Sequence, residues 1–416
     1  MYCRKKKKFL VLSGKLEIMN EKIRIVFVYT CLGEGGISTS LMALLHELSS
    51  DERLDITLCL LNRDNTSRFV LPESININYP SKILDLWYKD KQKCKGLNLF
   101  NWYLLHFIGI KISMKPIELL SMIKKQKTYY DIAVSYVNDI NKPKYINMFC
   151  NDFVLKCLNA KQKWSWTHND PYRLGYTSEY IKKRYKDFDK IVNVSFACKK
   201  KFDTIYPDYT NKSFVVHNCV YEIKNNENVS DYLKKNDDKL RIVSVCRLDN
   251  KQKRIDRAID VCKLLIEKGY IEKFEWDIYG SGSDEKYLKN YAIEKSVENK
   301  LLFKGTTKEP LEKMKNADVF VMTSDYEACG LTLLESLSVG TPVIVTDFPE
   351  ARESVSDMKN GFIVDITTDA IADKLIQVIE DRTLLQQLRT YIKNNPVSNK
   401  QSLIEFYNLL EDSVLK

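Results

Sequence analysis

The stretch SDYEACGLTLLES, from Ser324 to Ser336, carries two glutamates, Glu327 and Glu335, separated by seven residues. An apolar run of strand length, ADVFVMT (317–323), comes before it, and residues 333–337 begin a helical pattern that Gly340-Thr341-Pro342 ends. These neighbours predict a strand-to-helix turn between the two carboxylates. A helix N-terminus offers backbone N–H groups to a phosphate, and carboxylates accept hydrogen bonds from hydroxyls. The stretch therefore indicates a site for a nucleotide sugar, with solvated surface charges as the alternative.

Three further features follow predicted strands in the second half of the chain. Arg247 and Lys253 follow the strand at 240–246, and the turn of Gly280 and Gly282 follows the strand at 274–279. Gly305-Thr306-Thr307 follows the strand at 301–304. Open α/β sheets bind ligands at the carboxyl ends of their strands, so these features and the glutamate turn are expected at one edge. The two cations would hold a diphosphate there, with a solvated basic loop as the alternative.

The first half begins with another strand and helix. The apolar run 23–30 is followed by a glycine turn that contains Gly35 and Gly36, and by a helical pattern at 38–48. The dinucleotide-binding fingerprint requires a third glycine where Ser38 stands. This unit keeps a nicotinamide-dependent oxidoreductase open as the alternative function.

His168 follows a predicted strand at 163–167. A histidine at the carboxyl end of a strand lies where open α/β sheets bind ligands, and Trp164 and Trp166 are its aromatic neighbours. A purely structural histidine is the alternative.

Length and composition suggest about two domains. We expect a basic, disordered tail at 1–20, a first Rossmann-like domain at 21–220, a polar linker at 221–239 and a second Rossmann-like domain at 240–396. The 11 cysteines and four histidines show no metal-site spacing. The formal net charge of +10 accompanies no nucleic-acid signature, so we expect no nucleic-acid partner.

Residues 82–130 alternate lysines with large apolar side chains. One interpretation is a surface that contacts anionic lipid headgroups. The other is an ordinary pair of amphipathic helices that pack on the sheet.

The second half resembles the family 4 retaining glycosyltransferases, which have the GT-B fold of two Rossmann-like domains facing each other across a cleft. The segments that carry the resemblance lie within residues 240–365: RLDNKQKRID, IYGSGSDEKYL, FKGTTKEPLEKMKNADVFVMTS, EACGLTLLE, GTPVIVTDFP and NGFIVD. In the first half, GEGGIST and WTHND match more loosely. Cys246 and Arg254 stand where the family usually has glycine.

The resemblance implies roles for individual residues. Arg247 and Lys253 would bind the donor diphosphate, Glu327 would contact the donor sugar, and Glu335 would bind the ribose. The remaining implied contacts are the backbone of Cys329, Gly330 and Leu331 with sugar and phosphate, Thr306 and Thr307 with the base, and Gly36 and His168 with sugar and acceptor.

The resemblance also implies retention at the anomeric carbon, no metal or other cofactor, and UDP as the nucleotide. We expect the acceptor to be a glycan or a polyprenyl-linked molecule in capsule, other surface polysaccharide or glycolipid assembly, and the stretch 82–130 motivates the lipid link. The scattered cysteines indicate a reducing compartment, so we expect a cytoplasmic enzyme, which the same stretch would make peripheral at the inner face of the cell membrane. A C-terminal helix at 397–416 would cross back to the first domain.

Overall fold

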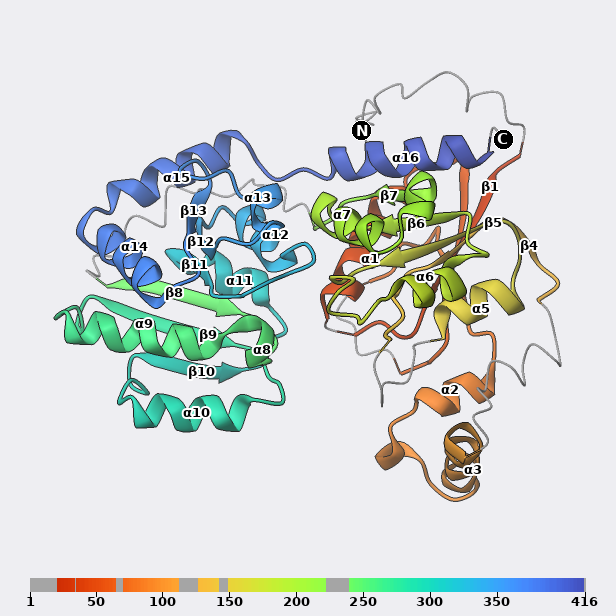
Figure 1. Cartoon of the computed structure of the whole chain (residues 1–416), viewed down its shortest axis with the longest axis horizontal. Helices are drawn as coiled ribbons and strands as arrows, with labels where there is room; N and C mark the ends of the chain where they lie inside the picture. The colour runs from red at the N-terminus through yellow and green to blue at the C-terminus, as the bar shows by residue number, and fades with distance from the viewer. Residues whose placement is uncertain are drawn as a thin grey trace, which may run out of the picture.

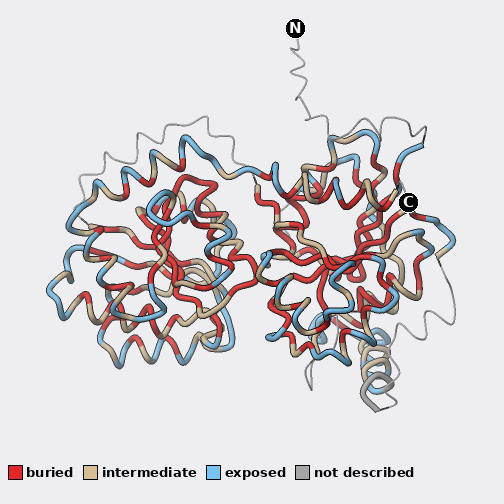
Figure 2. Tube along the Cα trace, turned by 45° about the horizontal axis from the view of Figure 1, so that its top comes forward, coloured by how far each residue is buried: buried red, intermediate tan, exposed pale blue. Residues whose placement is uncertain are grey.

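The computed structural model describes residues 21–33, 35–64, 70–111, 126–141, 149–221 and 239–414, with only the backbone for 108–111. The predicted tail at 1–20 and nearly all of the predicted linker at 221–239 lie outside these ranges. The chain forms two α/β units side by side, and buried residues are concentrated at the centre of each (Figures 1 and 2).

The first unit is built on a parallel sheet with the strand order β3-β2-β1-β4-β5-β6-β7. Its strands are β1 (Ile23–Tyr29), β2 (Leu54–Leu60), β3 (Asn76–Asn78), β4 (Tyr129–Ser135), β5 (Asn159–Thr167), β6 (Lys190–Asn193) and β7 (Ser213–Val215). Its helices are α1 (Gly36–Leu48), α2 (Lys82–Tyr88), α3 (Leu97–Lys111), α5 (Cys150–Cys157), α6 (Ser178–Tyr185) and α7 (Phe196–Ile205), with short 3-10 turns at Lys91–Lys93 and Pro207–Lys212.

The central strands of this sheet are apolar because helices cover both faces. In β1, six of the seven residues are buried, and the strand pairs in parallel with β2 and β4. Strand β5 begins at Asn159, four residues earlier than predicted. Its first half is polar and partly exposed, so no apolar run marks its start.

The second unit has a parallel sheet with the order β10-β9-β8-β11-β12-β13. Its strands are β8 (Leu240–Val245), β9 (Phe274–Tyr279), β10 (Leu301–Gly305), β11 (Val319–Met322), β12 (Val343–Thr346) and β13 (Gly361–Val364). Its helices are α8 (Asn250–Lys253), α9 (Ile255–Glu267), α10 (Glu285–Glu294), α11 (Pro310–Lys315), α12 (Leu331–Ser338), α13 (Ala351–Ser354), α14 (Thr368–Glu380) and α15 (Thr383–Asn394). The carboxyl ends of its strands point toward the first unit (Figure 1).

The last helix, α16 (Lys400–Val414), lies on the first unit (Figure 1). Phe406 is fully buried in the first core and stacks on Phe27, with ring centroids 6.4 Å apart. Just before the helix, the Asn399 side chain accepts a hydrogen bond from Val220 N (2.9 Å) and donates one to Val220 O (2.8 Å). Val220, at the end of the first unit, is therefore joined to the residue that directly precedes α16.

No helix in the described part of the chain is long and apolar enough to cross a bilayer.

Candidate functional site

A cavity of about 540 Å³ lies between the two units, with walls from both. This volume is within the usual range for small-molecule sites. Thirteen of the fourteen residues predicted from the sequence line it: Gly35, Gly36, His168, Arg247, Lys253, Gly280, Thr306, Thr307, Glu327, Cys329, Gly330, Leu331 and Glu335.

Gly282 is the exception, because it is not among the residues that line the cavity. A Cβ at this position would lie 2.3 Å from Leu248 O, so the glycine is required by contact between two loops. Gly280 reaches the cavity but is also constrained by packing. Its φ is 142°, and a Cβ there would lie 1.8 Å from Cys246 O. The glycine turn thus holds together the loops that follow β8 and β9.

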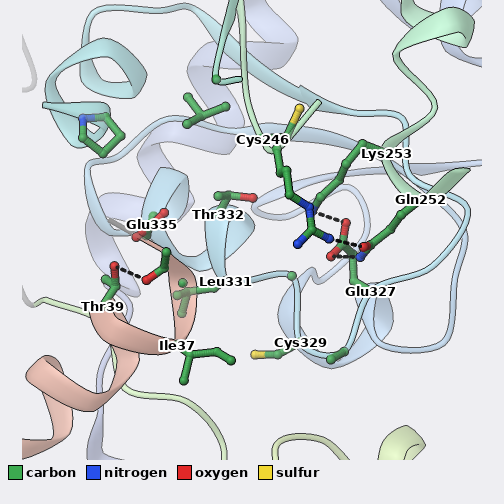
Figure 3. Close-up of a pocket in the computed structure, with 18 of the residues that line it drawn as sticks. Ile37, Thr39, Cys246, Gln252, Lys253, Glu327, Cys329, Leu331, Thr332 and Glu335 are labelled. Carbon is green, nitrogen blue, oxygen red and sulfur yellow. Dashed lines mark hydrogen bonds and ion pairs between the residues drawn. The ribbon is translucent and has the colours of Figure 1, made fainter. Parts of the chain in front are cut away.

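Glu327 and Lys253 form an ion pair at the centre of the site (Figure 3). Lys253 Nζ lies 2.6 Å from Glu327 Oε1, and the two side chains are only 14% and 8% exposed. The Ser324 hydroxyl also donates to Oε1, at 2.6 Å. Lys253 is the last residue of α8 rather than part of a loop. Its ammonium is therefore fixed in position by a carboxylate that other groups hold in turn.

Gln252 connects this pair to Arg247. The Gln252 amide donates to Glu327 Oε2 at 3.0 Å, and its oxygen accepts from Arg247 Nη2 at 3.2 Å. The Arg247 side chain is 62% exposed, so the guanidinium is far less confined than the Lys253 ammonium. Gln252 was not predicted from the sequence, although its place between Lys251 and Lys253 in the RLDNKQK segment was a signal.

Asp325 anchors the turn that contains Glu327 to two arginines. It accepts from Arg257 Nη2 at 2.6 Å and from Arg254 Nη1 at 3.1 Å. Burial acts to raise the pKa of Asp325, but these two guanidinium groups more than offset it and lower the pKa. Arg254 has a φ of 50°, a left-handed conformation that glycine adopts without steric cost. The arginine at this glycine position is held there by its ion pairs with Asp256 and Asp325.

Two helix N-termini, one from each unit, border the cavity close to each other. Helix α12 begins at Leu331 after Gly330, whose φ is 63°, and helix α1 begins at Gly36 after Gly35. Both starts line the cavity, and neither first turn contains an acidic residue. Glu335 is one turn further along α12, is 7% exposed, and lies on the side that faces α1 (Figure 3). Helix N-termini attract anions, so this arrangement favours a phosphate group between them.

His168 lies in the wall that the first unit contributes. Its ring is 4.5 Å from the Tyr136 ring and 6.1 Å from the Trp166 ring, measured between centroids. Burial lowers its pKa to about 3, so the imidazole is neutral at pH 7. Neither ring nitrogen has a hydrogen-bond partner among the described residues. Buried polar atoms are normally paired, which makes this ring suited to bind a ligand hydroxyl.

Asn218 is a second lining residue that the sequence analysis missed. Its Oδ1 accepts from Ser40 Oγ at 2.7 Å. It also hydrogen-bonds Cys329 of the other unit, although burial still raises the pKa of that thiol to about 12. No motif surrounds Asn218 in the sequence, so nothing short of the fold could have identified it.

One acidic segment of the second unit contacts α7 of the first unit. Glu353 accepts from the backbone N–H groups of Phe196 and Ala197, at 2.8 and 2.9 Å, and lies 3.2 Å from His217 Nε2. Glu350 pairs with Lys201 at 2.8 Å. The helix N-terminus and the cations make this contact electrostatic.

No group of three or more histidine, cysteine, aspartate or glutamate side chains suited to a metal ion occurs in the described ranges.

Comparison with known proteins adds the following. Over 157 residues, the chain is 28% identical to poly(ribitol-phosphate) alpha-N-acetylglucosaminyltransferase of Staphylococcus aureus. This match covers 37% of this chain and 31% of that protein. Over 129 residues, the chain is 30% identical to an Escherichia coli UDP-Gal:alpha-D-GlcNAc-diphosphoundecaprenol alpha-1,3-galactosyltransferase. This match covers 30% of this chain and 33% of that protein. The chain thus spans about a third of the length of these two relatives. Neither match supports the oxidoreductase alternative.

The fold matches a solved structure over nearly its whole length. A mutant of S. aureus TarM, in complex with fondaparinux, alpha-GlcNAc-glycerol and UDP, superposes with a TM-score of 0.65 at 15% identity, covering 94% of this chain and 99% of that one. This likeness confirms the predicted GT-B fold. The family model for glycosyl transferases group 1 matches residues 225–395, a range that includes all the strands of the second unit.

Proposed function

We propose that the protein is a retaining glycosyltransferase that moves a sugar from a nucleotide-sugar donor, with UDP as the nucleotide, to a glycan or polyprenyl-linked acceptor. The process would be surface polysaccharide or glycolipid assembly. The observation that carries the proposal is the cavity between two Rossmann-like units, where Arg247 and Lys253 meet two helix N-termini. Two relatives, a poly(ribitol-phosphate) alpha-N-acetylglucosaminyltransferase and a galactosyltransferase acting on alpha-D-GlcNAc-diphosphoundecaprenol, support the acceptor class.

The cations would serve the diphosphate in different ways. Lys253 is held by Glu327 and would supply a fixed positive charge to the leaving nucleotide. The exposed Arg247 would adjust to the incoming donor and complete a bidentate contact. Both Glu327 oxygens already accept hydrogen bonds from the protein, so we propose that positioning Lys253 is its first role and contact with the donor sugar its second.

The other lining residues would hold the rest of the donor. Glu335 would accept hydrogen bonds from the ribose, and Thr306 and Thr307 would border the base. With a pKa of about 3, His168 is a poor proton acceptor for catalysis. It would instead hydrogen-bond a sugar hydroxyl as a neutral imidazole.

We propose that no metal ion is required, because side chains and helix N-termini would neutralise the charge of the diphosphate. The charge that develops on the departing diphosphate would meet Lys253, Arg247 and the start of α12. Activity that is unchanged by EDTA is the expected result, and activity restored only by a divalent ion would contradict this part.

The test of the proposal is a panel of UDP-, GDP- and dTDP-sugars, assayed for slow hydrolysis because that reaction needs no acceptor. We expect nucleotide release from a UDP-sugar, with the α-anomer as the first sugar product by NMR. The Glu327→Gln variant keeps the side-chain shape, removes the charge that positions Lys253, and should lose most of this activity. Release from none of the donors, or full activity in this variant, would refute the proposal.

A further inference from the structure

Helix α3 projects from the first unit at the bottom of the view, beyond α2 (Figure 1). With α2 it forms a small helical extension between β3 and β4. The cavity is lined by no residue of either helix, so the extension has no evident part in donor binding.

One face of α3 is apolar and open to solvent. Its exposed side chains are Leu97 (74%), Phe100 (63%), Tyr103 (49%), Leu104 (46%) and Phe107 (57%). Spacings of three and four residues place all five on one side of the helix. Contiguous exposed apolar patches in soluble proteins mark contact sites.

The opposite face of α3 fixes this orientation. His106 stacks between Trp102 and Trp87, with ring centroids 3.7 and 4.4 Å away. The Trp102 indole donates to Lys89 O at 3.0 Å. The helix therefore cannot turn its apolar side chains inward without breaking this aromatic stack.

The segment just before α3 is rich in lysine. Residues 82–95 contain five lysines (Lys82, Lys89, Lys91, Lys93 and Lys95) and only two aspartates (Asp85 and Asp90). Lys91 Nζ lies 5.0 Å from the centroid of the Tyr103 ring, directly beside the face. An apolar stripe rimmed by cations is the pattern of helices that lie in the headgroup region of a bilayer.

We propose that the exposed face of α3 docks on an anionic lipid bilayer, with Phe100, Leu104 and Phe107 inserted at the headgroup–acyl boundary. The exposed Lys91 and Lys95 would contact the lipid phosphates. The same lysines oppose docking on a second copy of the chain, because two such faces would bring like charges together. This contact is independent of the donor site and needs no turnover.

Co-sedimentation of the full chain with vesicles tests the proposal. We expect strong recovery with phosphatidylcholine vesicles that contain phosphatidylglycerol, weak recovery with phosphatidylcholine alone, and release at high salt. Phe100→Ser with Phe107→Ser should lower the partition coefficient at least tenfold. The matched control is Tyr287→Ser with Ile293→Ser, two exposed apolar residues on α10, which should bind as the parent does.

A second pair of variants separates charge from insertion. Lys91→Gln with Lys95→Gln should weaken binding to anionic vesicles, whereas Lys286→Gln with Lys359→Gln, exposed lysines of the second unit, should not. Equal recovery with neutral and anionic vesicles would overturn the proposal. So would unchanged binding after loss of both phenylalanines, or a dimer in ultracentrifugation that those substitutions abolish without vesicle binding.

Discussion

Replacing Lys253 with methionine is the sharpest test of the site. The change removes the ammonium but keeps most of the side-chain volume. In the parent protein, Nζ lies 2.6 Å from Glu327 Oε1, with both side chains largely buried. Removing one preorganised donor to a developing negative charge typically costs about 2.7–4 kcal/mol, or roughly 10²–10³-fold in rate. We therefore expect kcat/KM for UDP-sugar hydrolysis to fall by about that factor.

The same change also affects folding stability. Glu327 keeps its hydrogen bonds from Gln252 and Ser324 but loses its cation. Breaking a fully buried pair costs about 3–5 kcal/mol, and the cavity beside this pair admits solvent, so we expect the lower end. The assay must therefore be run well below the Tm of the variant. Lys251→Met, two residues earlier at an exposed position, is the matched control. Activity of Lys253→Met within threefold of that control would refute the role given to this lysine.

Three further predictions concern stability. Gly280→Ala places a Cβ 1.8 Å from Cys246 O and should destabilise the fold by about 3 kcal/mol or more. The control is Gly35→Ala, whose Cβ would have no atom within 4 Å. Equal Tm values for the two variants would contradict the packing argument. Burial acts to lower the pKa of His217, but the carboxylates beside it raise the pKa to about 9. The stabilisation of the fold by protonated His217 should therefore be complete below pH 6.5 and lost as pH rises through 9. A His217→Gln variant with the same alkaline loss of Tm would show that this histidine is not the cause. Burial lowers the pKa of His168 to about 3, so the unfolded chain binds a proton more readily than the folded protein does. Folding stability should therefore fall as pH drops from 6.5 toward 3. The His168→Phe variant should lose less Tm than the parent over that range, and an equal loss in both proteins would reject this explanation.

The sequence predicted the second unit well because its signals are local. Apolar runs marked β8, β9 and β11, and the turn that contains Gly330 was evident from the strand before it and the helix after it. Motif spacing then placed Lys253 and Glu327 in one site, where the structure shows them paired.

The residues that were missed depend on contacts between distant parts of the chain. Asn218 meets Ser40, 178 residues away, and Glu353 meets Phe196, 157 residues away. Neither residue lies in a periodic pattern or beside a recognisable motif. The same limit applies to Gly282, whose spacing suggested a ligand loop although its neighbour is the Leu248 backbone.

The hydrogen bonds between Val220 and Asn399 restrict how the cavity can open. Asn399 also donates to Glu47 of α1 at 3.0 Å, so both partners of this contact belong to the first unit. The two connections to the second unit therefore leave the first unit at neighbouring points, which favours rotation about that place over a slide of one unit along the other. In such a rotation the displacement grows with distance from the contact. In Figure 1, β10 and the crossing from α15 to α16 lie on opposite sides of the second unit, so the side of the cavity nearest Thr306 would widen most. The nucleotide base that we propose to bind there would be the first part of a spent donor to reach water.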